Sequence, residues 1–342
     1  MPPLSNEDIA ELLALRAEEA EGDRQRAYRR AASAALMWPE EVADLVSEGR
    51  NPQELRGIGP RISGLLRSWL EDPPEVPEQP LARRGFISFA RALHVVDEHP
   101  DWRRGLRGDL QMHTIYSDGK ETIEEMARTG IEYGHEYVAI TDHSKGLKIA
   151  GGMSEARLAE QRTEIAQVNE RLDGFRVLSA LEMNLNPTGE GDMEEESLRP
   201  LDLVIGSFHS SLRGTEDQTS RYIAAVSHPH VDVLGHPRGR VYNRRAGLQA
   251  DWEKVFDAAV EHETAFEINS YPDRQDLDIA LLTAARDAGV SFSIGTDAHD
   301  SFEMQFFPVG LAAAVTAGIP RERIVNFLDA ETLIESLGHG RH

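Results

Sequence analysis

The sequence predicts an α/β fold: a distorted seven-stranded (β/α)7 barrel of the TIM-like type, preceded by a small all-α domain. Two observations predict the barrel. From Gly108 onward, apolar runs of strand length alternate with longer runs of helical character. Six of the strand-like runs deliver a histidine, an aspartate or a glutamate at the C-terminal end, and that end is where such barrels gather their functional groups.

Seven strand-like runs follow one another in this part of the chain. They lie at residues 109–113, 137–143, 176–182, 201–209, 231–237, 264–269 and 291–299. Helical runs separate them at residues 122–133, 154–172, 217–226, 250–260 and 277–288. Because a regular barrel has eight strands, we expect a distorted barrel that is closed partly by helices at residues 306–317 and 321–337.

The first 70 residues predict helices. Residues 7–20 show amphipathic spacing with Ser5 or Asn6 as the N-cap, and residues 25–36 are rich in alanine. Residues 71–80 are rich in proline and glutamate, and we expect them to stay extended. The expected domains are a helical domain at residues 1–70, a linker with one connecting helix (86–96) at residues 71–107, a barrel at residues 108–337 and a tail at residues 338–342.

The segment Gly57-Ile58-Gly59-Pro60 predicts a tight turn that enters a second helix at proline. It resembles the helix-hairpin-helix motif, in which two glycines let the backbone approach a phosphate and the next helix points its amides at it. A plain turn between two helices is the alternative. Arg61 and Arg67 in the following helix favour binding of DNA at Gly57, Gly59 and Arg61.

The composition excludes several kinds of site. The chain has no cysteine, so any metal must bind imidazole and carboxylate rather than thiolate. The net charge of −23 argues against nonspecific binding of nucleic acid by the whole surface. Residues 1–108 carry 15 arginines and 19 acidic residues, so the acidic field is concentrated in the barrel, as several divalent cations require. With no membrane span and no signal peptide in the sequence, we expect a cytoplasmic protein.

Eight side chains at the strand ends form a candidate metal site. They are His113, Asp118, His143, Glu182, His209, His236, Asp297 and His299. Eight ligands exceed what one ion requires, so we expect several ions that share a bridging glutamate. Imidazole and carboxylate ligands suit Zn, Mn or Fe. Such a cluster can clamp a phosphate and lower the pKa of a bound water enough to give a hydroxide nucleophile, which is chemistry that phosphoester hydrolysis uses.

A buried imidazole that serves only packing is the alternative for any one of these histidines. That alternative does not explain six strand ends that carry the same residue types. Asp142 precedes His143, and we expect it to orient a ligand or the strand end rather than to bind metal. Structural roles are expected for the histidines away from the strand ends, which are His94, His99, His135, His228, His230 and His262.

Six short motifs carry a resemblance to a known family. They are Gly-Asp-Leu-x-x-His-Thr, Ser-Asp-Gly, Thr-Asp-His-Ser, Gly-Ser-Phe-His, Gly-His-Pro and Thr-Asp-Ala-His, in this order. In combination they resemble the PHP (polymerase and histidinol phosphatase) family of metal-dependent phosphoesterases. The resemblance implies catalytic roles for Glu182, His209 and Asp297. It also implies three ions: one held by His113, Glu182 and Asp297, one by Glu182, His209 and His236, and one by Asp118, His143 and His299.

One position departs from the family pattern. Gln111 stands where the family usually has the first histidine of its His-x-His motif. An amide oxygen is a harder and weaker ligand than imidazole, so Gln111 is expected to be a weak ligand, and the first ion should bind more loosely or favour Mn over Zn.

The resemblance is greatest to the PHP domain of bacterial family-X DNA polymerases. Residues 141–154 and 267–274 resemble that domain, and residues 26–32 with the glycine hairpin are similar to the first helical domain of the same polymerases. Between the two, no segment remains for the polymerase core with its paired aspartates. We therefore expect no DNA synthesis.

This resemblance implies a metal-dependent DNA phosphoesterase, a 3′-5′ exonuclease or 3′-end-processing enzyme of DNA repair that acts through a metal-activated hydroxide. DNA is the expected partner, and Lys148 and Arg238 are candidate substrate contacts near the rim. A small-molecule phosphomonoesterase of the histidinol-phosphatase type is the alternative. A DNA-binding adaptor with a purely structural metal site is a third, non-enzymatic interpretation.

Overall fold

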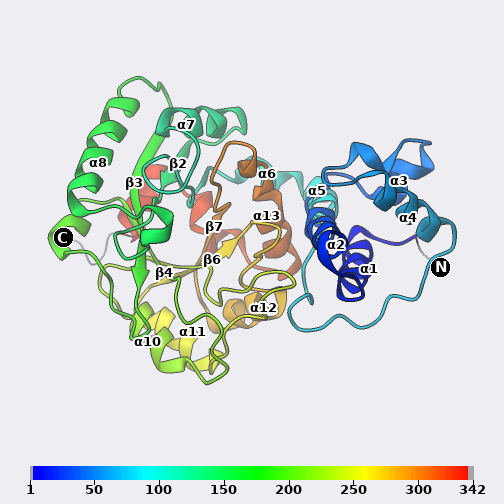
Figure 1. Cartoon of the computed structure of the whole chain (residues 1–342). Helices are drawn as coiled ribbons and strands as arrows, with labels where there is room; N and C mark the ends of the chain where they lie inside the picture. Colours follow the sequence, from blue (N-terminus) through cyan, green and yellow to red (C-terminus); the bar gives the residue numbers. More distant parts are fainter. Residues whose placement is uncertain (1–2, 338–342) are drawn as a thin grey trace.

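Seven parallel strands form one sheet in chain order, each strand hydrogen-bonded to the next. They are β1 (Gly108–Asp109), β2 (Tyr137–Ile140), β3 (Arg176–Leu185), β4 (Leu203–Phe208), β5 (Val233–Gly235), β6 (Ala265–Asn269) and β7 (Phe292–Gly295). Nearly all of their side chains are buried, because helices cover the outside of the sheet and apolar side chains fill its inside. The computed structural model, which describes residues 3–337, thus confirms the predicted distorted seven-stranded α/β barrel (Figure 1). The expected tail at residues 338–342 lies outside the described residues.

The gap between β1 and β7 is closed without a regular eighth strand. The backbone of residues 110–113 hydrogen-bonds to that of residues 294–298, just beyond the ends of the two strands. Asn326 joins the strands themselves: its side-chain amide donates to the carbonyls of Gly108 and Ile294, and its oxygen accepts from the Ile294 amide. The rim at the C-terminal ends of the strands is therefore continuous.

Eight helices accompany the strands in the described part of the barrel. They are α7 (Ile123–Glu132), α8 (Glu155–Asn169), α9 (Glu195–Leu198), α10 (Thr219–Val226), α11 (Trp252–Glu261), α12 (Ile279–Ala288), α13 (Phe307–Thr316) and α14 (Ala330–Leu337). Local signals fix several of their starts, because the side chains of Thr122, Ser154 and Asp278 accept hydrogen bonds from the first turns of α7, α8 and α12. No helix among residues 3–337 is long and apolar enough to cross a lipid bilayer.

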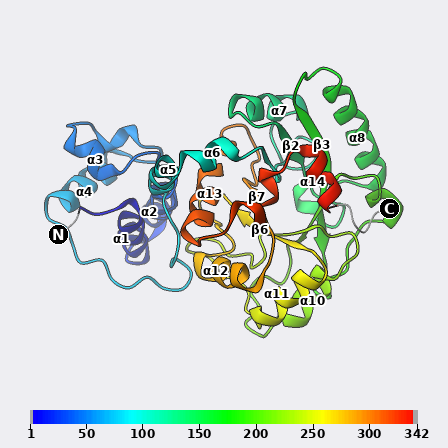
Figure 2. The same ribbon diagram turned by 180° about the vertical axis from the view of Figure 1, so that it is seen from behind.

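Helix α14 packs against the end of the barrel opposite the rim, and Figure 2 shows it lying across that face. Leu333 and Leu337 of α14 pack against side chains from the N-terminal ends of the strands, including Tyr137, Leu203 and Val233. This apolar layer excludes water from one end of the barrel, so the open end is the rim.

Two sequence expectations are corrected here. The helix expected at residues 321–337 is broken into two short 3-10 turns, Arg321–Arg323 and Val325–Phe327, followed by α14. A continuous helix could not present Asn326 to both strands it joins. The single connecting helix expected at residues 86–96 is in fact two helices, α5 (Phe89–Glu98) and α6 (Pro100–Gly105). Helix α6 has no buried residue, so it leaves no apolar periodicity in the sequence.

The N-terminal helices form a separate body beside the barrel (Figure 1). They are α1 (Asn6–Glu18), α2 (Gly22–Ala35), α3 (Val42–Ser47) and α4 (Pro60–Glu71), with a 3-10 turn at Pro52–Glu54. Their apolar side chains form a core of their own, and Tyr242 from a barrel loop also belongs to it. Helix α5 packs against α13 and its buried side chains belong to the barrel core, so the connection is anchored to the barrel.

A buried ion pair fixes the helical body against the barrel. The Arg83 guanidinium donates to both carboxylate oxygens of Glu11, at 2.8 and 2.9 Å, and the two side chains are 6% and 1% exposed. Arg83 also donates to Glu18 at 2.6 Å and to the side-chain oxygen of Asn243, in a barrel loop, at 2.9 Å. One guanidinium therefore ties α1, the linker and the barrel together.

Replacing Arg83 with leucine should destabilise the protein, because Glu11 would remain buried without a partner. Removing one member of such a pair costs about 3–5 kcal/mol in the free energy of unfolding. Urea titration followed by circular dichroism measures the change. Arg26→Leu is the matched control, since its ion pair with Asp23 is exposed and should contribute little. Equal stability of the two variants would contradict the anchoring role of Arg83.

Glu41 gives a pH-dependent contribution to stability. Burial raises the pKa of this carboxyl to about 7, and it accepts a hydrogen bond from the Asn6 amide at 2.7 Å. Because the folded pKa lies above the unfolded one, the folded state binds more protons between about pH 4.5 and 7, so stability falls as the pH rises through this range.

Glu41→Gln should remove this pH dependence. After allowance for partial exposure, the stability of the native protein relative to Glu41→Gln should fall by on the order of 1–2 kcal/mol between pH 4.5 and 7. Urea unfolding at a series of pH values measures the difference. The exposed Glu71→Gln is the control, and a pH-independent difference for Glu41→Gln would refute the interpretation.

Candidate metal centre

The strands and the loops that follow them bring the eight predicted side chains to one place on the rim. Their positions are His113 and Asp118 after β1, His143 after β2, Glu182 within β3, His209 after β4, His236 after β5, and Asp297 and His299 after β7. Contacts among them connect all eight into a single cluster. Six parallel strands of one barrel therefore contribute to one site.

Glu182 lies at the centre of this cluster and is fully buried. One carboxylate oxygen, Oε1, lies 2.8 Å from Nε2 of His236 and 3.4 Å from Nε2 of His209. The other oxygen, Oε2, lies 2.7 Å from Nδ1 of His143 and 3.7 Å from Nε2 of His113. The two oxygens thus face two different sets of imidazoles, as a carboxylate that bridges two ions would.

Two further sets of contacts join the remaining side chains to the cluster. Nε2 of His113 lies 3.1 Å from Oδ1 of Asp297. Oδ1 of Asp118 lies 3.5 Å from Nε2 of both His143 and His299. Two ligands that share an ion at about 2.1 Å in a tetrahedral site lie roughly 3.4 Å apart. These nitrogen–oxygen distances therefore fit side chains that share divalent cations.

Charges within the cluster keep its carboxyl groups ionised. Burial raises the pKa of Glu182, but its interactions with His143 and His209 outweigh burial and hold it well below its usual range. Burial is likewise outweighed at Asp297, whose pKa is held low by Arg274 and by the hydrogen bond from His113. Both groups are therefore carboxylates, which is the form that binds a cation.

The imidazoles fall into two sets. Burial lowers the pKa of His113 and of His209, which favours the neutral imidazole that ligates a metal. At His143 and His299 burial is outweighed: Glu182 raises the pKa of His143, and the hydrogen bond to Asp118 raises that of His299 to about 9. Positive charge is thus favoured beside the carboxylates, and a bound cation would displace the protons that supply it.

Backbone geometry directs two of these side chains inward. Asp297 has a φ of +57° and His236 a φ of +26°, both in the left-handed region that residues with a Cβ rarely adopt. Such strain persists only where the surrounding contacts hold it, and it is concentrated at functional sites. Asp297 is held by Asn269 and by Arg274, whose Nε lies 3.0 Å from the carboxylate.

Asp142 organises the loop that carries Asp118. Its carboxylate accepts hydrogen bonds from the backbone and side chain of both Thr114 and Ser117, and from the Gln161 amide at 2.6 Å. With these partners, Asp142 has no oxygen directed at the cluster. This arrangement matches the orienting role that the sequence favoured for it.

Gln111 and Glu267 lie at the base of the cluster. Both side chains are fully buried, and within the described residues both amide atoms of Gln111 and Oε1 of Glu267 have no hydrogen-bond partner. They pack across Gly295, where a Cβ would come within 2.5 Å of Glu267 and 2.7 Å of Gln111. The side-chain amide of Gln111 is therefore available as a weak metal ligand, because neither of its polar atoms is used in a hydrogen bond within residues 3–337.

Sequence reasoning missed Glu267 and Arg274. Glu267 supports a ligand through the backbone, because its Oε2 accepts a hydrogen bond of 2.6 Å from the His236 amide. Burial raises the pKa of Glu267 well above its usual range. It lies in the middle of the apolar run 264–269 rather than at its end, so the strand-end pattern does not single it out. Two signals were available: an acidic residue within an apolar strand, and the resemblance of residues 267–274 to the PHP domain of family-X polymerases.

The other predicted contacts lie in different surroundings. Lys148 is exposed in the loop after β2 and has no ion-pair partner in the described residues. Arg238 is buried and ion-paired with Asp278 at 2.6 Å, and it also donates to two loop carbonyls. Its guanidinium therefore holds a loop, and the expected substrate contact at Arg238 is corrected.

The hairpin residues lie in the helical body, away from the metal ligands. Gly57 has a φ of +84°, which a residue with a Cβ would adopt only with strain. Gly59 is the N-cap of α4, and no atom lies within 4 Å of where its Cβ would be, so its backbone can be approached closely. Arg61 is exposed, whereas Arg67 donates to the Arg50 carbonyl and serves the hairpin itself.

Comparisons with known proteins show the family to which this barrel belongs. The PHP domain model matches residues 109–271. A "DNA polymerase/3'-5' exonuclease PolX" from Bacillus subtilis is 37% identical over 222 residues, which cover 65% of this chain and 39% of that protein. A "probable phosphatase" from Thermoanaerobacter sp. is 30% identical over 230 residues, which cover 64% of this chain and 89% of that protein.

Among solved structures, a histidinol phosphate phosphatase from Lactococcus lactis in complex with zinc, L-histidinol and phosphate aligns with a TM-score of 0.43 and 18% identity. That alignment covers 68% of this chain and 94% of the other. The barrel, the strand-end cluster and the relatives define a metal-dependent phosphoesterase. The chain belongs to the PHP family, and it spans about two fifths of the PolX relative.

Gln111→His should strengthen the first ion site, because imidazole binds Zn or Mn more tightly than an amide oxygen does. After dialysis against metal-free buffer, the native protein should retain fewer than three ions per chain, and the variant should retain more than the native protein. Elemental analysis by plasma mass spectrometry measures both. Gln167→His, which adds an exposed imidazole on α8, is the control, and an unchanged metal content in Gln111→His would contradict the weak-site interpretation.

Proposed function

We propose that this PHP-family hydrolase cleaves DNA phosphoesters as a 3′-5′ exonuclease or 3′-end-processing enzyme in DNA repair. The convergence of eight metal-ligating side chains around the buried carboxylate of Glu182 supports hydrolysis at the rim. The glycine hairpin in the same chain supports DNA as the substrate. A PolX relative whose name includes a 3′-5′ exonuclease adds to this support.

Following the family resemblance, the ligands would form three groups, each holding one divalent ion. His113, Glu182 and Asp297 would hold the first, with Gln111 as a weak additional ligand. Glu182, His209 and His236 would hold the second, and Asp118, His143 and His299 the third. Three ions so held, Mn, Zn or Fe, would clamp the phosphoryl oxygens and activate the attacking water.

Residues of the barrel position the metal ligands and limit the access of water. Glu182 is the side chain that two ion groups share, and Asp297 is held in place by Arg274 and Asn269. The apolar layer beneath the rim excludes water from below. Lys148, exposed in the loop after β2, can pair with a phosphate at the edge of the rim.

The hairpin would hold the DNA backbone. Gly57 and Gly59 leave the turn open, and α4 begins there with no side-chain cap, so its first amides can donate to a phosphate. Arg61 adds a positive charge in the first turn of α4. Residues 72–107 hold only a linker, α5 and α6, so a polymerase core between hairpin and barrel is absent from the described chain and we expect no primer extension.

A small-molecule phosphomonoesterase is the second candidate. The Thermoanaerobacter relative is named a probable phosphatase, and the match covers 89% of it. The net charge of −23 also suits a compact anion at the metals better than a long duplex on the surface.

One assay separates the two candidates. With Mn present, the protein should shorten a 5′-labelled DNA strand to a ladder of products, because 3′ nucleotides are removed successively. Turnover of p-nitrophenyl phosphate and histidinol phosphate is measured in parallel. If only the small esters are hydrolysed, the second candidate replaces the first.

Asp297→Asn provides the mechanistic control for this assay. Loss of a charged ligand should reduce DNA cleavage by more than about 100-fold, since changes that only orient ligands already cost 10–100-fold. Asp257→Asn removes an exposed carboxylate on α11 and should cleave as the native protein does. Equal loss of activity in both variants would show that the activity does not come from the rim.

A further inference from the structure

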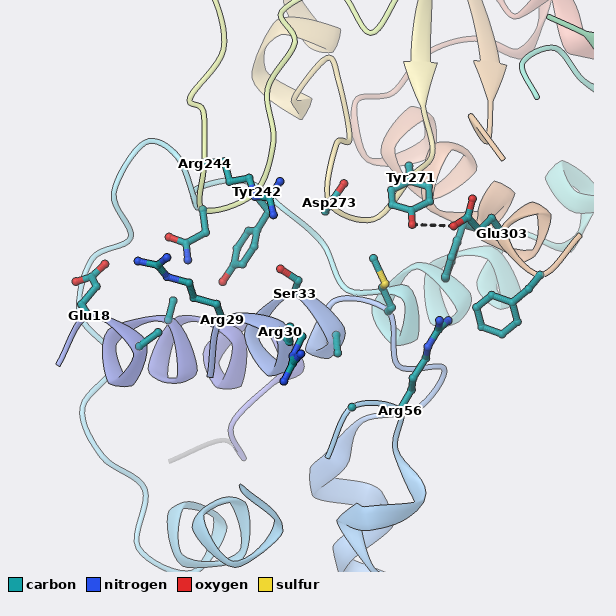
Figure 3. A pocket seen from close by; sticks show the side chains of 18 residues that line it. Glu18, Arg29, Arg30, Ser33, Arg56, Tyr242, Arg244, Tyr271, Asp273 and Glu303 are labelled. Carbon is teal, nitrogen blue, oxygen red and sulfur yellow. Dashed lines mark hydrogen bonds between the residues drawn. The ribbon is translucent and has the colours of Figure 1, made fainter. Parts of the chain in front are cut away.

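A cleft of about 670 Å³ separates the helical body from the barrel (Figure 3). Helix α2 and the turn before Gly57 line one side, and barrel loops that follow β5, β6 and β7 line the other. The buried contacts of Arg83 hold these two sides together. The cleft therefore belongs to the docked arrangement of the two bodies, and neither body contains it alone.

Four arginines line this cleft from both sides. Arg29 and Arg30 come from α2, Arg56 from the turn before the hairpin, and Arg244 from the barrel (Figure 3). All four are exposed, and none has an ion-pair partner within residues 3–337. In a chain with a net charge of −23, a cleft lined by four exposed guanidinium groups points to an anionic ligand.

Carboxylates in the cleft already have partners. Glu18 is ion-paired with Arg83 at 2.6 Å. Glu303 accepts hydrogen bonds from the Tyr271 hydroxyl and from the His299 amide. Asp273 interacts electrostatically with Arg274 and Arg244. The arginines on α2 and at Arg56 therefore remain free to bind a ligand.

An aromatic side chain lies among these charges. Phe302 is 50% exposed, which is unusual for phenylalanine, and the Arg56 guanidinium lies 4.8 Å from the centre of its ring. Tyr271 also lines the cleft. Cationic side chains interleaved with aromatic rings are typical of surfaces that bind single-stranded nucleic acid, where phosphates pair with arginine and bases stack on the rings.

The cleft borders both features that the proposed function requires. At one end, Arg30 and Gly57 line both the cleft and the groove beside the hairpin, which also contains Gly59 and Arg61. At the other end, Glu303 accepts a hydrogen bond of 2.8 Å from the backbone of the metal ligand His299. A strand held at the hairpin and laid along this cleft would therefore come to the loop that carries His299.

We propose that this cleft binds a single-stranded DNA tail and leads its 3′ end from the hairpin to the metal rim. The inference rests on the proposed function and specifies its substrate as a single strand. The metal ligands are mostly buried, so a strand end reaches them more readily than the side of a duplex does. Arg29, Arg30 and Arg56 contact the phosphates, and Phe302 stacks on a base.

The test uses the full chain loaded with Mn and a 5′-labelled oligothymidylate whose 3′-terminal linkages are phosphorothioates that resist hydrolysis. Fluorescence anisotropy gives the binding constant at several salt concentrations. For single strands the salt slope is about 0.7 per phosphate contact, so the triple variant Arg29→Ala/Arg30→Ala/Arg56→Ala should lower the slope by about 2. Phe302→Ala should weaken binding about fivefold or more.

A matched triple variant removes the same charge elsewhere. Arg104, Arg128 and Arg199 are exposed arginines outside the cleft, and their replacement by alanine should change the slope far less. If both triple variants behave alike, or if a blunt duplex binds as tightly as the single strand, the cleft proposal is overturned. A native protein that cleaves no DNA contradicts the proposed function instead, and the binding constants report on the cleft independently of that result.

Discussion

The buried charge of Glu182 is the constraint on which the rest of the structure depends. A carboxylate with no exposed surface is strongly unfavourable unless positive charge lies beside it. Four imidazoles surround this one at 2.7–3.7 Å, and the raised pKa of His143 shows that the site favours positive charge there. Protons or divalent cations can supply that charge, and cations bind by displacing the protons. Metal binding is therefore built into the barrel's own electrostatics, and the strand ends are arranged to serve it.

The barrel and its ligands could be predicted because both follow from local patterns. Short apolar runs alternate with helical ones, and in a parallel barrel the residue after each run must lie on the same rim. Glu267 lies in the middle of the apolar run 264–269 rather than at its end, which is why it was missed. For the substrate contact expected at Arg238 the reason is different. An arginine beside a ligand motif looks the same in the sequence whether it contacts substrate or, as here, pairs with Asp278. The breaks around Asn326 depend on hydrogen bonds to β1 and β7, contacts between residues more than thirty positions apart in the sequence.

The strained residues fit the same constraint. Asp297 and His236 adopt left-handed backbone conformations at the ends of β7 and β5, and both are in direct contact with the cluster. A relaxed backbone at either position would turn the side chain away from its partner in the cluster, which is His113 for Asp297 and Glu182 for His236. The contacts that hold them come from residues with no ligand role of their own: Arg274 and Asn269 at Asp297, and Glu267 at His236. Part of the folding free energy is thus spent on holding ligands in place.

The docking of the helical body against the barrel fixes the position of the hairpin relative to the metal centre. A hairpin that binds DNA backbone is useful to a distant metal site only if the two are held at a fixed separation. Arg83 provides that fixation, because it is bound at once to α1 through Glu11 and to the barrel through Asn243. Phe86 and Tyr242 add an apolar contact across the same junction, with ring centres 5.2 Å apart. Since the junction is buried and well partnered, the arginine-lined cleft between hairpin and rim has a defined shape. Under the proposed function, this fixed junction is what would let the chain guide a strand from the hairpin to the metal rim.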